Sequence, residues 1–282
     1  MIETYLALPT WAHLALAGVL GLIVGSFVNV VIVRLPPRLM HAWQMMAAAQ
    51  PDTDAPTPPG LMWPRSRCPR CEHTIAWHDN IPIVSWCLLQ GRCRHCRGAI
   101  GWRYPIVELI AAVAAVVVVA QWGLGWPTLA ALGLSWTLIA ASAIDLEHHL
   151  LPDVLTLGLL WAGLLINATF GWFATPTDAI WGAAAGFGVL WLVLNGFALL
   201  TGKEGMGGGD LKLLAALGAW LGWSMLPFVL FVASALGTVV GLLGMVLAQR
   251  GRDTPIAFGP HLALAGWLAL IWHAPLSDWF LF

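Results

Sequence analysis

Long apolar runs separated by short polar segments are the feature that most constrains how this chain can fold. A transmembrane helix needs about 20 consecutive apolar residues, and eight stretches of the 282-residue chain are candidates for such a helix. They cover residues 11–33, 104–122, 126–144, 153–172, 179–200, 210–223, 225–248 and 257–275, and the sixth is the weakest because it is short and bounded by glycines. Only 10% of the residues are charged, against about 25% in soluble domains. The sequence therefore predicts an all-α polytopic membrane protein with about eight transmembrane helices.

The lysine and arginine residues predict how these helices are oriented in the membrane. If the eight segments alternate in direction, all 13 basic residues fall on one side and none on the other. They are at positions 34, 38, 65, 67, 70, 92, 94, 97, 103, 203, 212, 250 and 252. Loops rich in basic residues stay in the cytoplasm, so we expect this side to be cytoplasmic and both termini to lie outside. The net charge of −1 gives no indication of nucleic-acid binding.

The first apolar segment is expected to be a retained helix and not a cleaved signal peptide, because no basic residue precedes it and it has no small-residue cleavage pattern. The predicted organisation is a first transmembrane helix (1–33), a cytoplasmic domain (34–103) and a seven-helix membrane domain (104–282). Residues 61–100 are too few to bury a core of their own, so this part of the cytoplasmic domain needs a crosslink.

Four of the five cysteines can supply that crosslink. They form two Cys-x-x-Cys pairs, Cys68 with Cys71 and Cys93 with Cys96. Two such turns offer four thiolates to one tetrahedral Zn²⁺, and neighbouring arginines help to keep the thiols deprotonated. Four thiolates leave no coordination position for water, so the predicted zinc is structural. Two disulfides are the alternative, which a reducing cytoplasm disfavours.

Other residues of the cytoplasmic domain are less central to this site. His73, His78 and His95 are further possible ligands, although four cysteines already complete a tetrahedral set. Cys87, the fifth cysteine, is expected to be a small buried hydrophobe.

Two aspartates stand where predicted helices meet the cytoplasmic side. Asp145 ends the third apolar segment and Asp210 begins the sixth. Ionisable groups at such positions are costly and indicate function. Two close carboxyl groups share one proton, so one can activate a water as a base while the other protonates a leaving amine. The pair predicts aspartyl proteolysis, and the alternative for Asp210 alone is a helix N-cap.

Glycines at 205, 207, 208 and 209 precede Asp210. Glycine allows positive φ and close approach of a second backbone, so we expect an extended substrate strand to fit beside Gly207 and Gly209. The cluster matches neither the phosphate-binding P-loop nor the dinucleotide-binding glycine pattern. Lys212 is expected on the cytoplasmic side, close to this site.

Several other ionisable residues compete for a role near the predicted site. Glu108, about one turn inside the second segment, is a candidate for a polar role that supports the active site, or for a pair with Arg103. Asp153 is expected to stabilise the first turn of a helix, and Glu147 to be a solvated loop acid. His148 and His149 adjoin Asp145 and could tune its pKa.

Six sequence blocks, in this order, resemble the signature blocks of the bacterial type IV prepilin peptidases, also called prepilin leader peptidase/N-methyltransferases. The blocks are GSFVNVVIVRLP (25–36), the two Cys-x-x-Cys pairs, RYPIVELI (103–110), IDLEHHLLPD (144–153), GKEGMGGGDLKLLAALGAWLGW (202–223) and IAFGPHLALAGW (256–267). The resemblance covers nearly the whole chain. It implies that the catalytic aspartates are Asp145 and Asp210, the latter in a G-x-G-D motif, and that the family's cysteine tetrad is the one described above. Ala257 departs from the family, which usually has proline there.

The resemblance also implies a bifunctional enzyme of the bacterial inner membrane. Members of the family remove the short basic leader of type IV prepilins and type II secretion pseudopilins, cutting after a glycine at the cytoplasmic face. They then methylate the new N-terminal residue with S-adenosylmethionine, so the implied cofactors are zinc and this methyl donor. No glycine pattern for the donor is recognisable; the zinc domain, Glu108, Ser26, Asn29 and Arg34 are possible contributors. The alternatives are a G-x-G-D protease without methyltransferase activity and an ion-coupled transporter.

Overall fold

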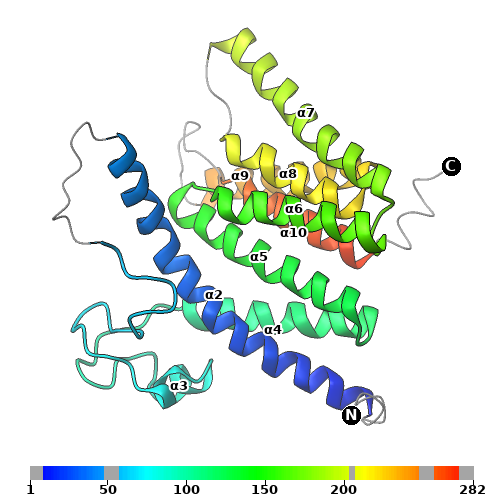
Figure 1. Ribbon diagram of the computed structural model, residues 1–282. Helices are drawn as coiled ribbons and strands as arrows, with labels where there is room; N and C mark the ends of the chain where they lie inside the picture. The colour runs from blue at the N-terminus through cyan, green and yellow to red at the C-terminus, as the bar shows by residue number, and fades with distance from the viewer. Residues whose placement is uncertain (1–8, 48–56, 203–206, 248–256, 273–282) are drawn as a thin grey trace. The chain divides into compact units, whose positions relative to one another are not determined.

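The structure is a computed structural model that describes residues 9–47, 57–202, 207–247 and 257–272 (Figure 1). Eight of its helices follow the eight apolar segments. They are α2 (Thr10–Ala47), α4 (Arg103–Trp122), α5 (Trp126–His148), α6 (Asp153–Phe170), α7 (Pro176–Thr201), α8 (Gly208–Leu221), α9 (Leu226–Leu247) and α10 (Gly259–Ile271). The short elements η1 (Trp77–Asn80), α3 (Val84–Leu88) and η2 (Trp223–Met225) complete the described part.

Six of the described helices are long and apolar enough to cross a membrane: α2, α4, α5, α6, α7 and the stretch Trp223–Val246, which covers nearly all of α9. The other two, α8 and α10, have 14 and 13 residues. The prediction of an all-α, multi-pass membrane protein is confirmed. The weakest of the eight segments, 210–223, is one of the two that are too short to count as a span by themselves.

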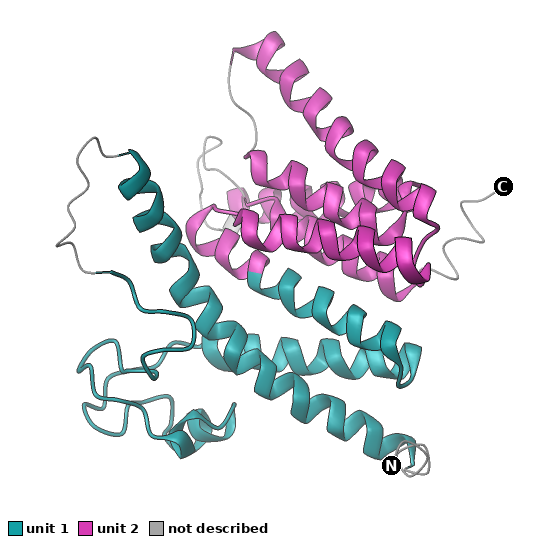
Figure 2. Ribbon diagram, viewed as in Figure 1, with its two compact units in different colours: residues 1–140 teal, residues 141–282 magenta. Residues whose placement is uncertain are grey.

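The chain divides into two compact units, residues 1–140 and 141–282 (Figure 2). In the first unit α2 packs along α4, and two glycines one turn apart make this possible. A Cβ on Gly21 would lie 2.5 Å from the Cα of Ala112, and a Cβ on Gly25 would lie 2.8 Å from the Cα of Glu108. Small residues at this spacing let membrane helices approach each other closely.

The same helix, α2, is longer than the predicted first span. It continues through Pro36 and Pro37 to Ala47 and has 38 residues. At 1.5 Å per residue it is about 57 Å long, whereas the hydrocarbon core of a bilayer is about 30 Å thick. The helix therefore extends well past residue 33, into the region assigned to the cytoplasmic domain.

The cysteine-containing part of the first unit is built around two turns of the same shape. In the first, the N–H of Cys68 donates to the carbonyl of His73 at 3.0 Å; in the second, the N–H of Cys93 donates to the carbonyl of Gly98 at 2.8 Å. Each turn also has one residue with positive φ four positions after its first cysteine, Glu72 at 54° and Arg97 at 56°. The two turns are therefore a structural repeat, which the sequence indicates only through the two Cys-x-x-Cys pairs.

In the second unit α8 is the central helix. Every residue from 210 to 221 except Lys212 is buried, and α6, α7 and α10 pack against the helix (Figure 1). Trp220 donates from Nε1 to the carbonyl of Leu159 at 2.8 Å. Its indole ring also fills the space beside Gly163 on α6. Because protein surrounds α8 on these sides, the helix does not need the length of a span that faces lipid.

The contact between α7 and α8 depends on glycine on both sides. A Cβ built on Gly182 or on Gly218 would overlap the carbonyl of the other. Gly182→Ala is therefore expected to separate the helices and to lower the free energy of unfolding by about 1–3 kcal/mol, measured by thermal unfolding of the purified protein. Gly188→Ala on the same helix is the control, because no atom lies within 4 Å of a Cβ there. Equal stability of the two variants would contradict the packing.

Candidate functional site

Asp145 and Asp210 both belong to the second unit and are both buried, each with 6% of its surface exposed. Asp145 is in the last turn of α5, and Asp210 is in the first turn of α8. Leu151 packs against residues beside both acids. A Cβ on Gly209, the neighbour of Asp210, would lie 2.6 Å from Leu151. A Cβ on Gly259 would lie 2.7 Å from Asp145 and 3.0 Å from Leu151. The two carboxyl groups are close enough to interact electrostatically. The fold therefore brings the two predicted acids together.

The carboxylate of Asp145 is held by the start of α10. The backbone N–H of Gly259 donates to Oδ2 of Asp145 at 3.1 Å, although the two residues are 114 positions apart. Gly259 is the first residue of α10, and the N-terminal end of a helix with its N–H donors stabilises negative charge. The sequence placed Gly259 in a signature block but gave it no role. Its role depends on a long-range contact that no local pattern indicates.

Two histidines lie near Asp145. Both His149 and His261 are close enough to interact electrostatically with it. The N–H of His149 donates to the carbonyl of Asp145 at 2.9 Å. His261 is buried on α10, and its Nδ1 lies 3.0 Å from the carbonyl of Ala257. His149 was among the predicted neighbours of Asp145, whereas His261 was missed because α10 is remote in the sequence.

Asp210 has a different environment. Its Oδ1 is buried and has no hydrogen-bond partner among the described residues. The N-cap of α8 is Gly207, and no side chain caps this helix, so the alternative that Asp210 is an N-cap is wrong. A buried acceptor without a partner costs about 1–3 kcal/mol. A substrate group or a water that donated to this oxygen would remove that cost.

The glycines before Asp210 serve two purposes. Gly209 lets the chain approach Leu151, and the positions of a Cβ on Gly207 and Gly208 face open space. The predicted positive φ is not found at Gly207, whose φ is −73°. Gly205 lies outside the described residues. Glycine is thus needed at position 209 for close approach and not for an unusual backbone conformation.

Lys212, the predicted support residue on α8, is paired with the start of α6. Its Nζ lies 2.6 Å from Oδ1 of Asp153, and both side chains are partly exposed. Asp153 is in the first turn of α6, as predicted. Exposed ion pairs of this kind contribute about 0–1 kcal/mol to the free energy of unfolding. The main effect of this pair is therefore to position Lys212 and not to stabilise the unit.

Gly259→Ala is expected to lower the rate of peptide cleavage at this site about tenfold or more, with the chain still folded. The new Cβ would lie 2.7 Å from Oδ2 of Asp145, so the hydrogen bond to the carboxylate would be displaced, and a lost hydrogen bond to a charged group costs about 1.5–3 kcal/mol. Cleavage of a substrate by purified protein measures the effect. Gly237→Ala is the control, because its nearest neighbour would be 3.8 Å away. A normal rate in Gly259→Ala would exclude this role for the start of α10.

The four predicted cysteine ligands come together in the first unit. The Sγ atoms of Cys68, Cys71, Cys93 and Cys96 all lie within 4.8 Å of one another, and those of Cys68 and Cys96 are 3.8 Å apart. A tetrahedral zinc with Zn–S bonds of about 2.3 Å places its sulfurs about 3.8 Å apart. The cluster can therefore hold one metal ion, and the alternative of two disulfides is not found, since all five cysteines are free.

The thiols of this cluster do not ionise independently. Burial raises the pKa of Cys68, but hydrogen bonds from the backbone of Arg70 and Cys71 and from neighbouring cysteines lower it further, to about 6. The backbone N–H of His73 lowers the pKa of Cys71, but burial and the neighbouring sulfurs raise it more, to about 11. Cys68 is therefore mostly a thiolate at neutral pH even without a bound metal ion. A bound cation would be needed to deprotonate Cys71 at neutral pH.

The remaining candidates of this domain lie outside the cluster. The rings of His73 and His95 face each other, with centroids 3.4 Å apart, and the metal-binding group found among the described residues contains cysteines only. Cys87 is exposed on α3, so the prediction that it is a buried hydrophobe is wrong. The short α3 has too few residues to enclose its own side chains.

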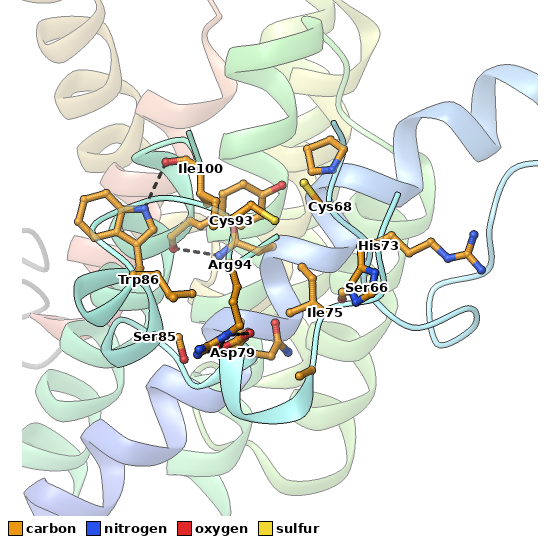
Figure 3. Close-up of a pocket in the computed structure, with 18 of the residues that line it drawn as sticks. Ser66, Cys68, His73, Ile75, Asp79, Ser85, Trp86, Cys93, Arg94 and Ile100 are labelled. Carbon is orange, nitrogen blue, oxygen red and sulfur yellow. Dashed lines mark hydrogen bonds and ion pairs between the residues drawn. The ribbon is translucent and has the colours of Figure 1, made fainter. Parts of the chain in front are cut away.

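A cavity of about 450 Å³ also belongs to the first unit, and it is lined by α2, α4 and the cysteine-containing segment (Figure 3). Glu108 lines it and is buried, accepting a 2.7 Å hydrogen bond from the N–H of Ile83 and another from the hydroxyl of Ser26. Asp79 lines it too, with Arg94 donating to both carboxylate oxygens. These hydrogen bonds hold the pKa of Asp79 below its usual range.

Comparison with known proteins gives one consistent result. The family model for the bacterial peptidase A24 N-terminal domain matches residues 19–122, and the model for the type IV leader peptidase family matches residues 132–242. A prepilin leader peptidase/N-methyltransferase of Aeromonas salmonicida is 49% identical over 100% of this chain and 98% of its own. Proteins of the same name from Stutzerimonas stutzeri and Pseudomonas aeruginosa are each 47% identical over 95% of this chain and 93% of their own. No solved structure matches.

Proposed function

The chain belongs to the type IV leader peptidase family, and from this premise we propose that it removes the leader peptide of type IV prepilins and N-methylates the new N-terminus. The observation that carries the peptidase half is the pair of buried aspartates, Asp145 and Asp210, in one unit. The name that its relatives share supports both activities. Pseudopilins of type II secretion are proposed as further substrates, by resemblance to the same family.

In the proposed cleavage, the two carboxyl groups hold one proton between them. The N–H of Gly259 supports a negative charge on Asp145, so Asp145 starts as the base that takes a proton from the attacking water. Asp210, whose Oδ1 lacks a partner, starts as the acid that donates to the peptide and finally to the leaving amine. Two carboxyl groups so close cannot both ionise easily, so one stays protonated as the acid while the other is ionised and acts as the base.

The substrate is proposed to lie across the start of α8. Gly207 and Gly208 face open space, which supports room there for an extended peptide, with Gly209 keeping Asp210 close to Leu151. The proposed supporting residues are Gly207, Gly209 and Lys212, and the last is held near this end of α8 by Asp153. The zinc domain and both aspartates are proposed to lie on the cytoplasmic side of the bacterial inner membrane, with both termini outside.

The proposed metal is one structural zinc held by the four cysteines. The sulfur spacing of 3.8 Å between Cys68 and Cys96 fits a tetrahedral zinc site. Four sulfur ligands would close the coordination shell, so this ion would crosslink the two turns and would not activate water. The proposed extents of the domains remain residues 1–33, 34–103 and 104–282.

The second proposed activity requires S-adenosylmethionine, which supplies an electrophilic methyl group on a sulfonium. The residues of this chain then have to bind the donor, exclude water and receive the new N-terminus as a neutral amine. Methyl transfer would form one C–N bond and break the C–S bond of the sulfonium, which would leave as the thioether S-adenosylhomocysteine, and the methylated nitrogen would lose one proton. The cavity of the first unit has the size of a small-molecule site, which is about 300–1,000 Å³.

One experiment tests both halves. Purified full-length protein is given a prepilin and methyl-labelled S-adenosylmethionine, and mass spectrometry identifies the new N-terminus and the label. We expect cleavage after a glycine and one methyl group on the residue that follows. Cleavage without label would exclude the methyltransferase half, and no cleavage would exclude the peptidase.

A further inference from the structure

The cavity of the first unit contains two buried oxygen acceptors whose polar partners carry no charge. Asn29 is only 3% exposed, and its Nδ2 donates to the carbonyl of Tyr104 at 3.0 Å. This bond fixes the amide, and Oδ1 of Asn29 has no hydrogen-bond partner among the described residues. Glu108 is 7% exposed, and its donors, the N–H of Ile83 and the hydroxyl of Ser26, are neutral.

These two side chains are neighbours because α2 and α4 cross with glycine at the contact. Gly25 packs on the backbone of Glu108, and one turn further along both helices Asn29 bonds to Tyr104. Both Asn29 and Glu108 line the cavity. The acceptors therefore lie at one place in its wall, at the α2–α4 crossing.

A strained turn holds the carboxylate of Glu108 in position. Ile83 has φ of 57° and ψ of −48°, a region that a β-branched residue rarely adopts. It is the centre of a three-residue γ-turn, in which the N–H of Val84 donates to the carbonyl of Pro82 at 2.5 Å. The turn directs the N–H of Ile83 to Glu108. Backbone strain of this kind is characteristic of ligand sites.

The other carboxylate of the cavity is already neutralised. Asp79 receives hydrogen bonds from Arg94 to both of its oxygens (Figure 3), the shortest of 2.6 Å. A buried carboxylate without a cationic partner costs free energy. A cation bound in this cavity would therefore be stabilised most strongly beside Glu108. An ammonium group matches this place, because it has three donors and no acceptor, and it can satisfy Glu108 and Oδ1 of Asn29 together.

We propose that this cavity is the methyl-donor site and that Glu108 and Asn29 hold the α-ammonium group of S-adenosylmethionine. The proposal rests on the methyltransferase half of the proposed function. Trp86 lines the same cavity (Figure 3), where its Nε1 donates to the carbonyl of Ile100 and its ring packs against that of Trp102. All these residues belong to the first unit, and both aspartates belong to the second. The two activities are therefore expected to be separable by mutation.

Binding to the purified full-length protein tests the proposal without any turnover. Two probes are compared by calorimetry: S-adenosylhomocysteine, which has the α-ammonium group, and 5′-methylthioadenosine, which lacks the whole amino-acid part. Glu108→Gln is expected to weaken S-adenosylhomocysteine about 10- to 100-fold, because a hydrogen bond to a charged group is lost. It is expected to leave methylthioadenosine unchanged. Asn29→Ala is expected to weaken only the first probe, about tenfold.

Two controls separate this effect from misfolding. Glu72→Gln makes the same chemical change on an exposed residue of the same unit, and it is expected to bind both probes normally. Asp145→Asn is expected to bind both probes normally while it loses cleavage. Calorimetry reports the affinity of the folded fraction, and unfolded protein lowers only the number of binding sites for both probes, so a partly unfolded preparation does not imitate a selective loss of affinity.

The outcomes distinguish this proposal from the function on which it rests. Selective loss of S-adenosylhomocysteine in Glu108→Gln and Asn29→Ala supports the ammonium site. Unchanged affinity, or equal loss of both probes, overturns it even if the wild-type chain methylates its substrate. A wild-type chain that cleaves prepilin but binds neither probe and transfers no methyl group overturns the methyltransferase function itself.

Discussion

Asp145→Asn and Asp210→Asn are each expected to lower prepilin cleavage about a thousandfold or more. General acid–base catalysis contributes about 10²–10⁴-fold, and neither asparagine can carry the proton that the two carboxyl groups exchange. The change is small in volume, and both sites are buried, so the variants are expected to insert and fold. The measurement is the rate of leader removal by purified protein at equal concentration.

Asp178→Asn is the matched control for this pair. Asp178 is in the same unit, in the first turn of α7, where its carboxylate accepts hydrogen bonds from Thr175 and Trp223. Asparagine can keep an acceptor there, so cleavage is expected to stay close to the wild-type rate. If either aspartate of the proposed pair could be replaced without a loss of rate, the two-carboxylate mechanism would have to be abandoned.

The second large effect is expected at the cysteine cluster. Wild-type protein is expected to contain about one zinc per chain, and Cys68→Ser to contain much less. Structural zinc in small domains is worth about 10 kcal/mol or more, and the segment around these cysteines has only short helices. Loss of the ion is therefore expected to unfold residues 61–102. Elemental analysis measures the metal, and limited proteolysis measures the unfolding.

Cys87→Ser makes the same substitution outside the cluster. Cys87 is exposed on α3 and is not one of the four sulfurs that lie within 4.8 Å of one another. Its replacement is expected to leave both the zinc content and the protease resistance unchanged. A full complement of zinc in Cys68→Ser would show that this sulfur is not a ligand.

The parts of the fold that the sequence predicts well are those set by local composition. Each long apolar run forms a helix whatever its neighbours are, and all eight predicted segments correspond to helices. Each Cys-x-x-Cys spacing forms a turn that presents two thiols, and the fold brings the two turns together. Asp145 and Asp210 were singled out because an acid at the end of an apolar run is costly and needs a reason.

The parts that could not be predicted depend on contacts between distant segments. Nothing local to Gly259 indicates that its N–H donates to Asp145, and nothing local to His261 places it near the same acid. The unpartnered oxygen of Asn29 depends on how α2 crosses α4. Cys87 was assigned to a core by residue type alone, but α3 has no core around it.

The enclosure of α8 has a consequence for how the enzyme responds to its lipids. A helix that faces the hydrocarbon adjusts its tilt when the bilayer becomes thicker or thinner, and α7 and α9 present many exposed apolar side chains of this kind. All residues of α8 from Asp210 onward except Lys212 are covered by the protein, and α6, α7 and α10 pack against it. The depth of Asp210 is therefore set by neighbouring helices, and membrane thickness acts on it only through them.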